Sequence, residues 1–163
     1  MIWLALAVVI LMISFGAVLF YGAPYLPSLT PQVNAALELS ELKAGDMLLE
    51  LGCGDGKVLI AAAKLGISSV GYELNPVVAL VAWLRTRKYK SQVKIICGNF
   101  WAADWPQVNA IFTFLLPKYM ARLDNKIYQY QYMPTKLISN AFVIPNKPIK
   151  AQKNGVNLYI YNK

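Results

Sequence analysis

The sequence contains no histidine, only two cysteines, and no charged side chain in its first 37 residues. Without histidine, the Ser-His and Cys-His pairs of many nucleophilic enzymes cannot form. Two cysteines without histidine do not make a zinc site, and they indicate no disulfide framework. Any chemistry that this chain performs must therefore run without imidazole.

Charge is missing from one end of the chain and concentrated in the rest. All 16 Lys and Arg residues and all 8 Asp and Glu residues lie between Glu38 and Lys163, for a net charge of +8. Residues 2–21 are apolar apart from Ser14, and a helix of that length rises about 30 Å, the thickness of a bilayer core. The segment lacks the basic start and small-residue cleavage site of a signal peptide. We expect a retained transmembrane anchor over residues 1–22. The alternatives are a buried core helix or an atypical signal peptide.

The distribution of basic residues also predicts an orientation. Every Lys and Arg follows the apolar segment, so the positive-inside rule places the remaining chain on the cytoplasmic side of a single-pass membrane protein. Residues 23–45 form a Pro-containing linker followed by a helix over about residues 31–42. Thr30 is the expected N-cap of that helix, with Pro31 at its first position.

Residues 46–163 alternate between strand and helix patterns, which predicts one α/β domain. Alternation of this kind is typical of a Rossmann-like, doubly wound and mostly parallel sheet. Asn154-Gly155 favours a C-terminal antiparallel hairpin between a strand near Ile149 and one over residues 156–161. The order of these last strands stays open. The other strands are expected at 47–51, 69–73, 93–97, 110–115 and 137–144, and the helices at 57–65, 76–89 and 119–130.

Glycines at alternate positions follow the first predicted strand, in the run Glu-Leu-Gly-Cys-Gly-Asp-Gly at 50–56. Glycine lets the backbone approach a ligand closely, and doubly wound sheets bind nucleotides at this strand end. The spacing differs from the G-x-G-x-x-G of dinucleotide sites. Glu50 and Asp55 would repel a pyrophosphate but suit a sulfonium and an ammonium group. The loop therefore favours S-adenosylmethionine (SAM) over NAD or a nucleoside triphosphate; the alternative is a tight turn without a ligand.

Further candidates stand at the ends of the next two predicted strands. Glu73 can accept hydrogen bonds from ribose hydroxyls, or it can be a surface acid. Asn99 can bond the adenine edge and Phe100 can stack on its face, although Phe100 also suits the core. No catalytic residue is assigned. The predicted cofactor site comprises Glu50, Gly52, Cys53, Gly54, Asp55, Gly56, Glu73, Asn99 and Phe100.

The glycine run at 52–56, together with Glu73, resembles the SAM-binding motifs of class I methyltransferases. A longer resemblance includes Pro-Tyr-Leu-Pro at 24–27 and Gly-Tyr-Glu-Leu-Asn-Pro at 71–76. It is similar to membrane-associated protein-lysine methyltransferases, including the mitochondrial enzymes that act on the adenine nucleotide translocase and the ATP synthase c-subunit. The resemblance implies a lysine substrate on a membrane or membrane-associated protein. It also implies a SAM site that includes Glu50, Gly52, Gly54, Glu73 and Asn99, although many relatives have an acid in place of Asn99.

The segment after the fourth predicted strand bears on the substrate. Residues 114–117 read Phe-Leu-Leu-Pro and lack the Asn-Pro-Pro-Tyr type of signature found in enzymes that methylate amide or base nitrogens. Nucleic acid is therefore not the expected partner. Asp104 and Tyr119 are candidates for the substrate pocket. Two alternatives remain: a lipid, quinone or other small apolar acceptor, and a non-catalytic SAM-binding membrane scaffold.

Basic residues gather in two groups, one within ten residues of sequence and the other at every fourth residue on one side of a predicted helix. Such groups form either a solvated face or a surface for anionic lipid or nucleic acid. No RNA-binding motif accompanies the charge, and the predicted anchor makes anionic lipid the simpler partner. The two groups are Arg85, Arg87, Lys88, Lys90 and Lys94, and then Lys118, Arg122 and Lys126.

Overall fold

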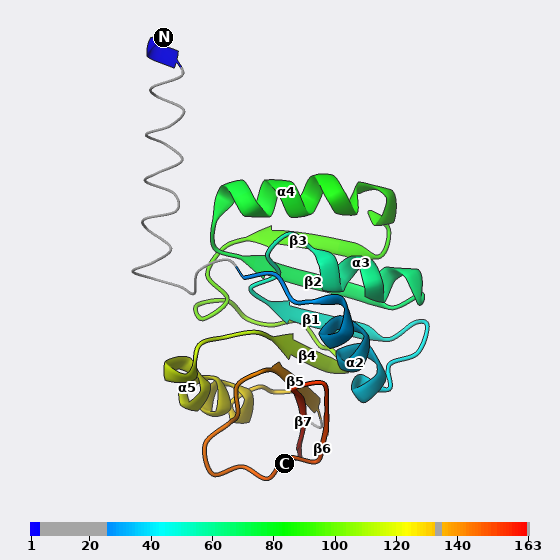
Figure 1. Cartoon of the computed structure of the whole chain (residues 1–163), viewed down its shortest axis with the longest axis vertical. Helices are drawn as coiled ribbons and strands as arrows, with labels where there is room; N and C mark the ends of the chain where they lie inside the picture. The colour runs from blue at the N-terminus through cyan, green and yellow to red at the C-terminus, as the bar shows by residue number, and fades with distance from the viewer. Residues whose placement is uncertain (4–25, 133–134, 163) are drawn as a thin grey trace.

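The computed structural model describes residues 1–3, 26–132 and 135–162. Within these ranges one sheet has the strand order β3-β2-β1-β4-β5-β7-β6 (Figure 1). Strands β1 to β5 run parallel to one another. The strands are β1 (Met47–Leu51), β2 (Ser68–Glu73), β3 (Val93–Cys97), β4 (Ala110–Thr113), β5 (Thr135–Asn140), β6 (Ala151–Lys153) and β7 (Val156–Tyr161). The helices are α2 (Thr30–Ser40), α3 (Lys57–Lys64), α4 (Pro76–Thr86), the 3₁₀ turn η1 (Arg87–Tyr89) and α5 (Pro117–Tyr128).

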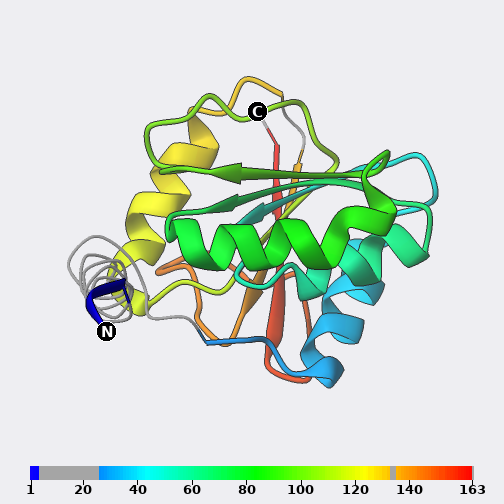
Figure 2. The ribbon, with the colours of Figure 1, turned by 90° about the horizontal axis from the view of Figure 1, so that it is seen from above.

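Helices cover both faces of the sheet, which confirms the predicted Rossmann-like, doubly wound architecture. Helices α2, α3 and α4 lie on one face and α5 on the other (Figure 2). Strand β1 shows why: Leu48 packs with α2 and α3, whereas Leu49 and Leu51 pack with α5. Successive side chains of a strand point to opposite faces, so the leucines of β1 need apolar cover on both sides of the sheet.

The C-terminal hairpin is present and also resolves the open strand order. Asn154 and Gly155 have φ of +50° and +76°, as a hairpin turn of the predicted kind requires. Strand β7 pairs antiparallel with β5 on one side and with β6 on the other. Because β7 is antiparallel to both, β6 runs parallel to β5 at the edge of the sheet. The connection from β5 to β6 contains no helix.

The structure corrects the predicted start and end of the first described helix. Leu29, not Thr30, is the N-cap of α2, and no side chain caps this end. Thr30 is already helical because Pro31 suits the first turn of a helix. The helix ends at Ser40, since Glu41 adopts a left-handed conformation with φ of +52°. The expected helix over 31–42 is therefore displaced by one or two residues.

The predicted strand over 137–144 was wrong at its C-terminal end. Strand β5 ends at Asn140, and Ala141 takes a φ of +66° that breaks the extended backbone. The Ser139 hydroxyl donates to the Phe142 carbonyl at 2.6 Å and stabilises the turn. Ile144 is buried in the core without being in a strand, and its N–H donates to the Tyr159 hydroxyl at 3.1 Å. Tertiary contacts bury Ile144, so an apolar residue stands at this position. In the sequence it therefore extends the apolar pattern of the strand, although it is not part of it.

The predicted transmembrane anchor over residues 1–22 lies outside the described residues beyond position 3. Within the described ranges, no helix combines the length and the hydropathy needed to cross a bilayer. The described part of the linker is bonded to the domain. Lys57 Nζ donates to the Ser28 carbonyl at 2.9 Å, and Asn140 Nδ2 donates to Ser28 Oγ at 3.3 Å.

Candidate functional site

The carboxyl ends of β1, β2 and β3 lie side by side, so the loops that follow them meet at one edge of the sheet. Leu51 is in register with Tyr72, and Glu73 with Cys97. The N–H groups of Gly52 and Cys53 donate to the Tyr72 carbonyl at 2.9 and 2.8 Å. The predicted residues after β1 are therefore brought next to the predicted acid at the end of β2.

The glycine loop needs glycine for its backbone and leaves room beside it. Gly52, Gly54 and Gly56 have φ of +81°, +53° and +77°, values that side-chain-bearing residues rarely adopt. A Cβ added at Gly52 would meet no atom within 4 Å. At Gly56 it would lie 3.1 Å from Thr86 Cγ2 of α4. Gly56 therefore permits helix packing, whereas Gly52 borders open space suited to a ligand.

Glu73 holds the loop in place with both carboxylate oxygens. Oε2 accepts the Gly54 N–H at 3.0 Å, and Oε1 accepts the Asn75 N–H at 2.9 Å. Asn75 in turn caps α4, because its Oδ1 accepts the N–H groups of Val77 and Val78. A carboxylate oxygen has two lone pairs, so each one can still accept a ribose hydroxyl. The ribose contact itself stays a prediction.

Glu50 is a buried acid at the centre of this edge. Its side chain is 4% exposed, and Oε2 has no hydrogen-bond partner among the described residues. Burial, followed by the negative charge of Glu73, raises the pKa of Glu50 well above its ordinary range. A buried carboxylate is stabilised by a paired cation. A ligand with an ammonium group would supply that cation, which fits the amino-acid part of SAM.

Cys53 and Asp55 have structural contacts that the sequence did not reveal. The Cys53 side chain lies in a core cluster with Leu59 and Ala82, and burial raises the pKa of its thiol. Any contact of Cys53 with a ligand must therefore come from its backbone. Asp55 forms an ion pair with Arg85 of α4. The electrostatic preference for a cationic ligand consequently depends on Glu50 and Glu73 more than on Asp55.

Asn99 and Phe100 lie in the loop after β3, as predicted. Asn99 is exposed, and its Oδ1 accepts the Trp101 N–H at 2.9 Å. Phe100 is half-buried, with its ring centre 4.6 Å from that of Trp101. These contacts shape the turn at the edge where an adenine would lie. Whether Asn99 and Phe100 touch adenine remains a prediction.

Two of the three basic residues on α5 stabilise this loop. The Arg122 guanidinium lies 4.3 Å from the ring centre of Trp101. Lys126 Nζ donates to the carbonyls of Trp101 and Ala103 at 3.1 and 3.2 Å. The Trp101 ring also lies 6.0 Å from that of Tyr119, a predicted pocket residue. Arg122 and Lys126 are therefore not simply a solvated face or a lipid contact.

Asp104, the other predicted pocket residue, is exposed in the same connection between β3 and β4. Burial and the Asp104 charge raise the pKa of Tyr72, whose side chain lies on the α5 face of β2. Asp104 is thus close enough to act on the sheet electrostatically. The end of β4 is joined to the end of β1, directly before the glycine loop, because Thr113 Oγ1 donates to the Leu51 carbonyl at 3.4 Å.

Sequence reasoning missed Gly71 and misread Arg85. A Cβ at Gly71 would lie 2.6 Å from Leu59 Cδ1 and 2.7 Å from Cys53 Cβ, so only glycine lets the loop pack against β2. Glycine inside a strand often marks such a close approach, which is a signal that the sequence does contain. Arg85 belongs to the predicted group of surface cations, and nothing local in the sequence indicates its pairing with Asp55.

Comparison with known proteins agrees with the motifs at this edge. The family model of the ANTKMT methyltransferase domain matches residues 50–151. The chain is 32% identical over 127 residues to the ATP synthase c-subunit lysine N-methyltransferase of Xenopus laevis, covering 76% of this chain and 55% of that protein. The chain thus spans about half the length of this vertebrate relative.

An archaeal relative and a solved structure match over most of their length. A protein-lysine N-methyltransferase of Saccharolobus islandicus is 28% identical, with 85% of this chain and 91% of that protein covered. An RNA methyltransferase from Salinibacter ruber, solved with S-adenosyl-L-homocysteine, is 25% identical with a TM-score of 0.76. That match covers 83% of this chain and 92% of the other. These two proteins differ in the acceptor that their names state.

Proposed function

The chain belongs to the ANTKMT methyltransferase domain family, and from that membership we propose that it transfers methyl groups from SAM to lysine side chains of a membrane or membrane-associated protein. The observation that carries the cofactor part of the proposal is the buried Oε2 of Glu50, which has no partner among the described residues. Gly52, two residues further on, borders open space. A polar group at the cofactor edge that has no partner among the described residues favours a ligand that provides one.

The described residues fit SAM in three places. Glu50 would pair with the ammonium group of SAM. Gly52 would leave room for the methionine part, and Glu73 would accept hydrogen bonds from the ribose. SAM supplies a methyl group already activated by a sulfonium, so the protein contributes mainly by positioning and by excluding water. The bonds from Glu73 to Gly54 and Asn75 keep the loop in one geometry before the ligand binds.

A lysine acceptor must lose its proton before it attacks a methyl group. An apolar surrounding lowers the pKa of an amine, and the segment at the carboxyl end of β4 provides apolar side chains. Leu115 is buried there, and the Phe114 and Phe142 rings stack with centres 6.1 Å apart. The names of the Xenopus and Saccharolobus relatives support lysine as the acceptor. No residue is assigned as the catalytic base.

The proposal also includes a membrane location. Its support is the uncharged, apolar sequence of residues 2–21, which would serve as a single-pass anchor with the domain on the cytoplasmic side. The full-length chain should then resist alkaline carbonate extraction from membranes. A chain that begins at Tyr25 should stay in the supernatant; if it remains with the membranes, residues 1–22 are not the anchor.

Incubation of the full-length protein with host membranes and methyl-labelled SAM tests the activity. We expect label in a protein band, and hydrolysis of that band should release methylated lysine. Label in a lipid extract would instead indicate a lipid, quinone or other small apolar acceptor. SAM binding without any label transfer would indicate a non-catalytic scaffold.

Gly52→Ala is the variant that tests cofactor binding. The added methyl group meets no protein atom within 4 Å, so it should enter the ligand space while the fold survives. Its φ of +81° adds strain of roughly 1–2 kcal/mol. We expect loss of both SAM binding and label transfer, with circular dichroism unchanged. Normal SAM affinity in this variant would contradict the proposed cofactor site.

A further inference from the structure

The outer face of α4 carries large apolar side chains that are exposed. Helix α4 lies on the outside of the sheet, beside β2 and β3 (Figure 2). Its inner side, with Val78, Ala79 and Ala82, is buried. A group of exposed apolar residues on one helix face usually marks an interaction site. We define the α4 face as Leu80, Val81, Trp83 and Leu84, which are 55%, 41%, 51% and 49% exposed.

Positive charge borders the α4 face, and the surrounding segment of sequence contains no acid. Residues 74–103 include five Lys or Arg residues and neither Asp nor Glu. Arg85 is paired with Asp55, whereas Arg87, Lys88 and Lys90 at the C-terminal end are exposed. The Arg87 guanidinium lies 5.3 Å from the ring centre of Trp83, so a cation and an aromatic ring share one surface.

We propose that the α4 face docks on an anionic membrane surface. Leu80, Trp83 and Leu84 enter the boundary between headgroups and acyl chains, while Arg87, Lys88 and Lys90 contact lipid phosphates. An interfacial helix has this composition, with apolar and tryptophan side chains on one side and cations beside them. The cations gain energy only at a negative surface, so their presence selects anionic lipid.

A nucleic acid fits the α4 face less well. Phosphate and base recognition relies on polar side chains and on rings that stack against bases. The aliphatic side chains of Leu80, Val81 and Leu84 provide no hydrogen bonds, and their burial is most favourable in an apolar medium. Lipid accounts for both the apolar and the basic part of the surface.

Docking at α4 would also position the proposed active site. Helix α4 begins directly after Glu73 and Asn75, and Arg85 pairs with Asp55 in the glycine loop. The cofactor loop is therefore connected to the surface that touches the membrane. This consequence rests on the proposed function, whereas the docking itself does not require methyl transfer and is tested separately.

Tryptophan fluorescence in vesicles tests the docking with the full-length chain. The protein is reconstituted into vesicles of phosphatidylcholine alone or mixed with phosphatidylglycerol, with bromine on the acyl chains as the quencher. The difference between the wild type and Trp83→Phe isolates the Trp83 signal from Trp3, Trp101 and Trp105. We expect bromine to quench the Trp83 signal in mixed vesicles, and to quench it at least twofold less in phosphatidylcholine alone.

Two charge-reversal variants provide the matched comparison, each measured with and without Trp83→Phe. Arg87→Glu combined with Lys88→Glu should abolish lipid quenching of Trp83. Lys64→Glu combined with Lys150→Glu makes the same change in net charge at exposed sites elsewhere and should retain it. Both variants should bind SAM with wild-type affinity, which shows that the fold is intact.

Three results would overturn the proposal. Trp83 could be quenched by aqueous acrylamide but not by brominated lipid, which would leave the α4 face in solvent. It could be shielded from both quenchers, which would mean that protein covers it, either a second copy or residues 1–22. Shielding by added RNA, without lipid quenching, would assign the surface to nucleic acid. If the wild-type protein shows Trp83 quenching by lipid but transfers no methyl group, the result would count against the proposed function alone.

Discussion

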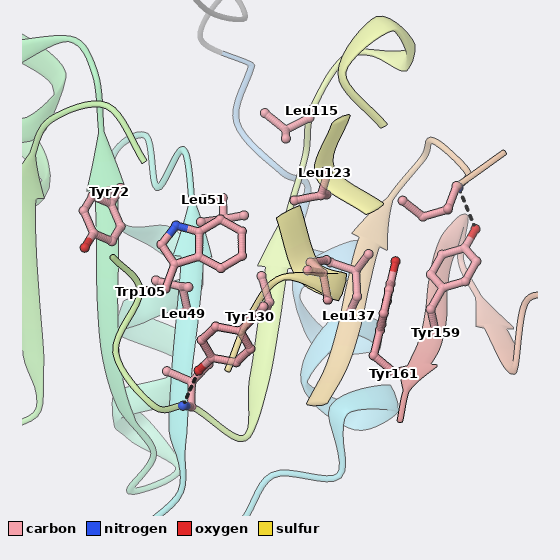
Figure 3. Packing of buried hydrophobic residues seen from close by; sticks show 14 of the residues in the cluster. Leu49, Leu51, Tyr72, Trp105, Leu115, Leu123, Tyr130, Leu137, Tyr159 and Tyr161 are labelled. Atoms are coloured by element: carbon pink, nitrogen blue, oxygen red, sulfur yellow. Dashed lines mark hydrogen bonds between the residues drawn. The ribbon is translucent and has the colours of Figure 1, made fainter. Parts of the chain in front are cut away.

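The two halves of the sheet treat their buried ionisable groups differently. In the half formed by β4 to β7, the buried tyrosines are paired. The Tyr130 hydroxyl accepts the Val108 N–H, and the Tyr159 hydroxyl accepts the Ile144 N–H (Figure 3). The Tyr130 hydroxyl also donates to the Pro106 carbonyl. In the half formed by β1 to β3, Glu50 Oε2 is buried without a partner among the described residues. Pairing stabilises the fold, whereas the unpaired acid is available to a ligand.

Unpaired atoms in the β4–β7 half do not remove this contrast. Thr135 Oγ1 and Asn157 Nδ2 are also buried without a partner in the part of the chain that the structure describes. Both belong to uncharged groups, whose burial costs far less than that of a carboxylate. The contrast therefore predicts that changes in the β4–β7 half lower stability, whereas changes in the β1–β3 half alter ligand binding.

The largest effect is expected from Leu123→Ala in α5. Leu123 is fully buried against the β4–β7 half, and removal of a buried leucine side chain costs about 2–5 kcal/mol of unfolding free energy. Urea denaturation measures this loss. Calorimetry on the folded fraction should find SAM affinity unchanged, and a large loss of affinity with normal stability would break the contrast between the halves.

Glu73→Ala should mainly affect binding. The substitution removes charge-assisted hydrogen bonds worth about 1.5–3 kcal/mol, so SAM affinity should fall by roughly ten- to a hundredfold. Titration calorimetry measures the SAM affinity of the variant. Glu38→Ala on α2 removes an exposed acid that pairs with Lys153 and should leave affinity unchanged. An affinity change of under about twofold in Glu73→Ala would mean that Glu73 does not contact the ribose.

Tyr130→Phe should lower stability by a smaller amount. The loss of its hydroxyl leaves the buried Val108 N–H without its partner, at a cost of about 1–2 kcal/mol. Thermal unfolding at one pH compares it with Tyr128→Phe, whose exposed hydroxyl accepts from Lys147 Nζ. Equal decreases in unfolding temperature in the two variants would show that burial of the hydrogen bond does not determine its contribution to stability.

The effect of Glu50→Gln without ligand depends on pH and vanishes near pH 4.5. The folded protein holds the Glu50 proton because the pKa is raised, while the unfolded chain loses it above the ordinary value of 4.5. Wild-type stability from this group is therefore lost as pH rises above 4.5 through the folded pKa. The Gln variant should unfold at a higher temperature than wild type at neutral pH, with the gap closing near pH 4.5. Parallel curves across that range would refute the assignment.

Much of the cofactor half was predictable because its signals are local. Strand β1, the glycine loop and the Asn75 cap each lie within a few consecutive residues. Glycine geometry, capping and strand alternation act over such distances. The turn at Asn154-Gly155 was predictable for the same reason. Where a prediction failed, as at Ile144, burial by distant residues had produced an apolar pattern without a strand.

The sequence by itself determined the alternation of strands and helices, the position of the glycine loop and the acids at the C-terminal ends of β1 and β2. Only the tertiary structure decided that β7 lies between β5 and β6, that Asp55 pairs with Arg85, and that Glu50 Oε2 is buried without a partner among the described residues. These features depend on which distant segments become neighbours. Backbone preferences depend on a few adjacent residues, whereas burial and charge pairing arise only when the whole chain is packed.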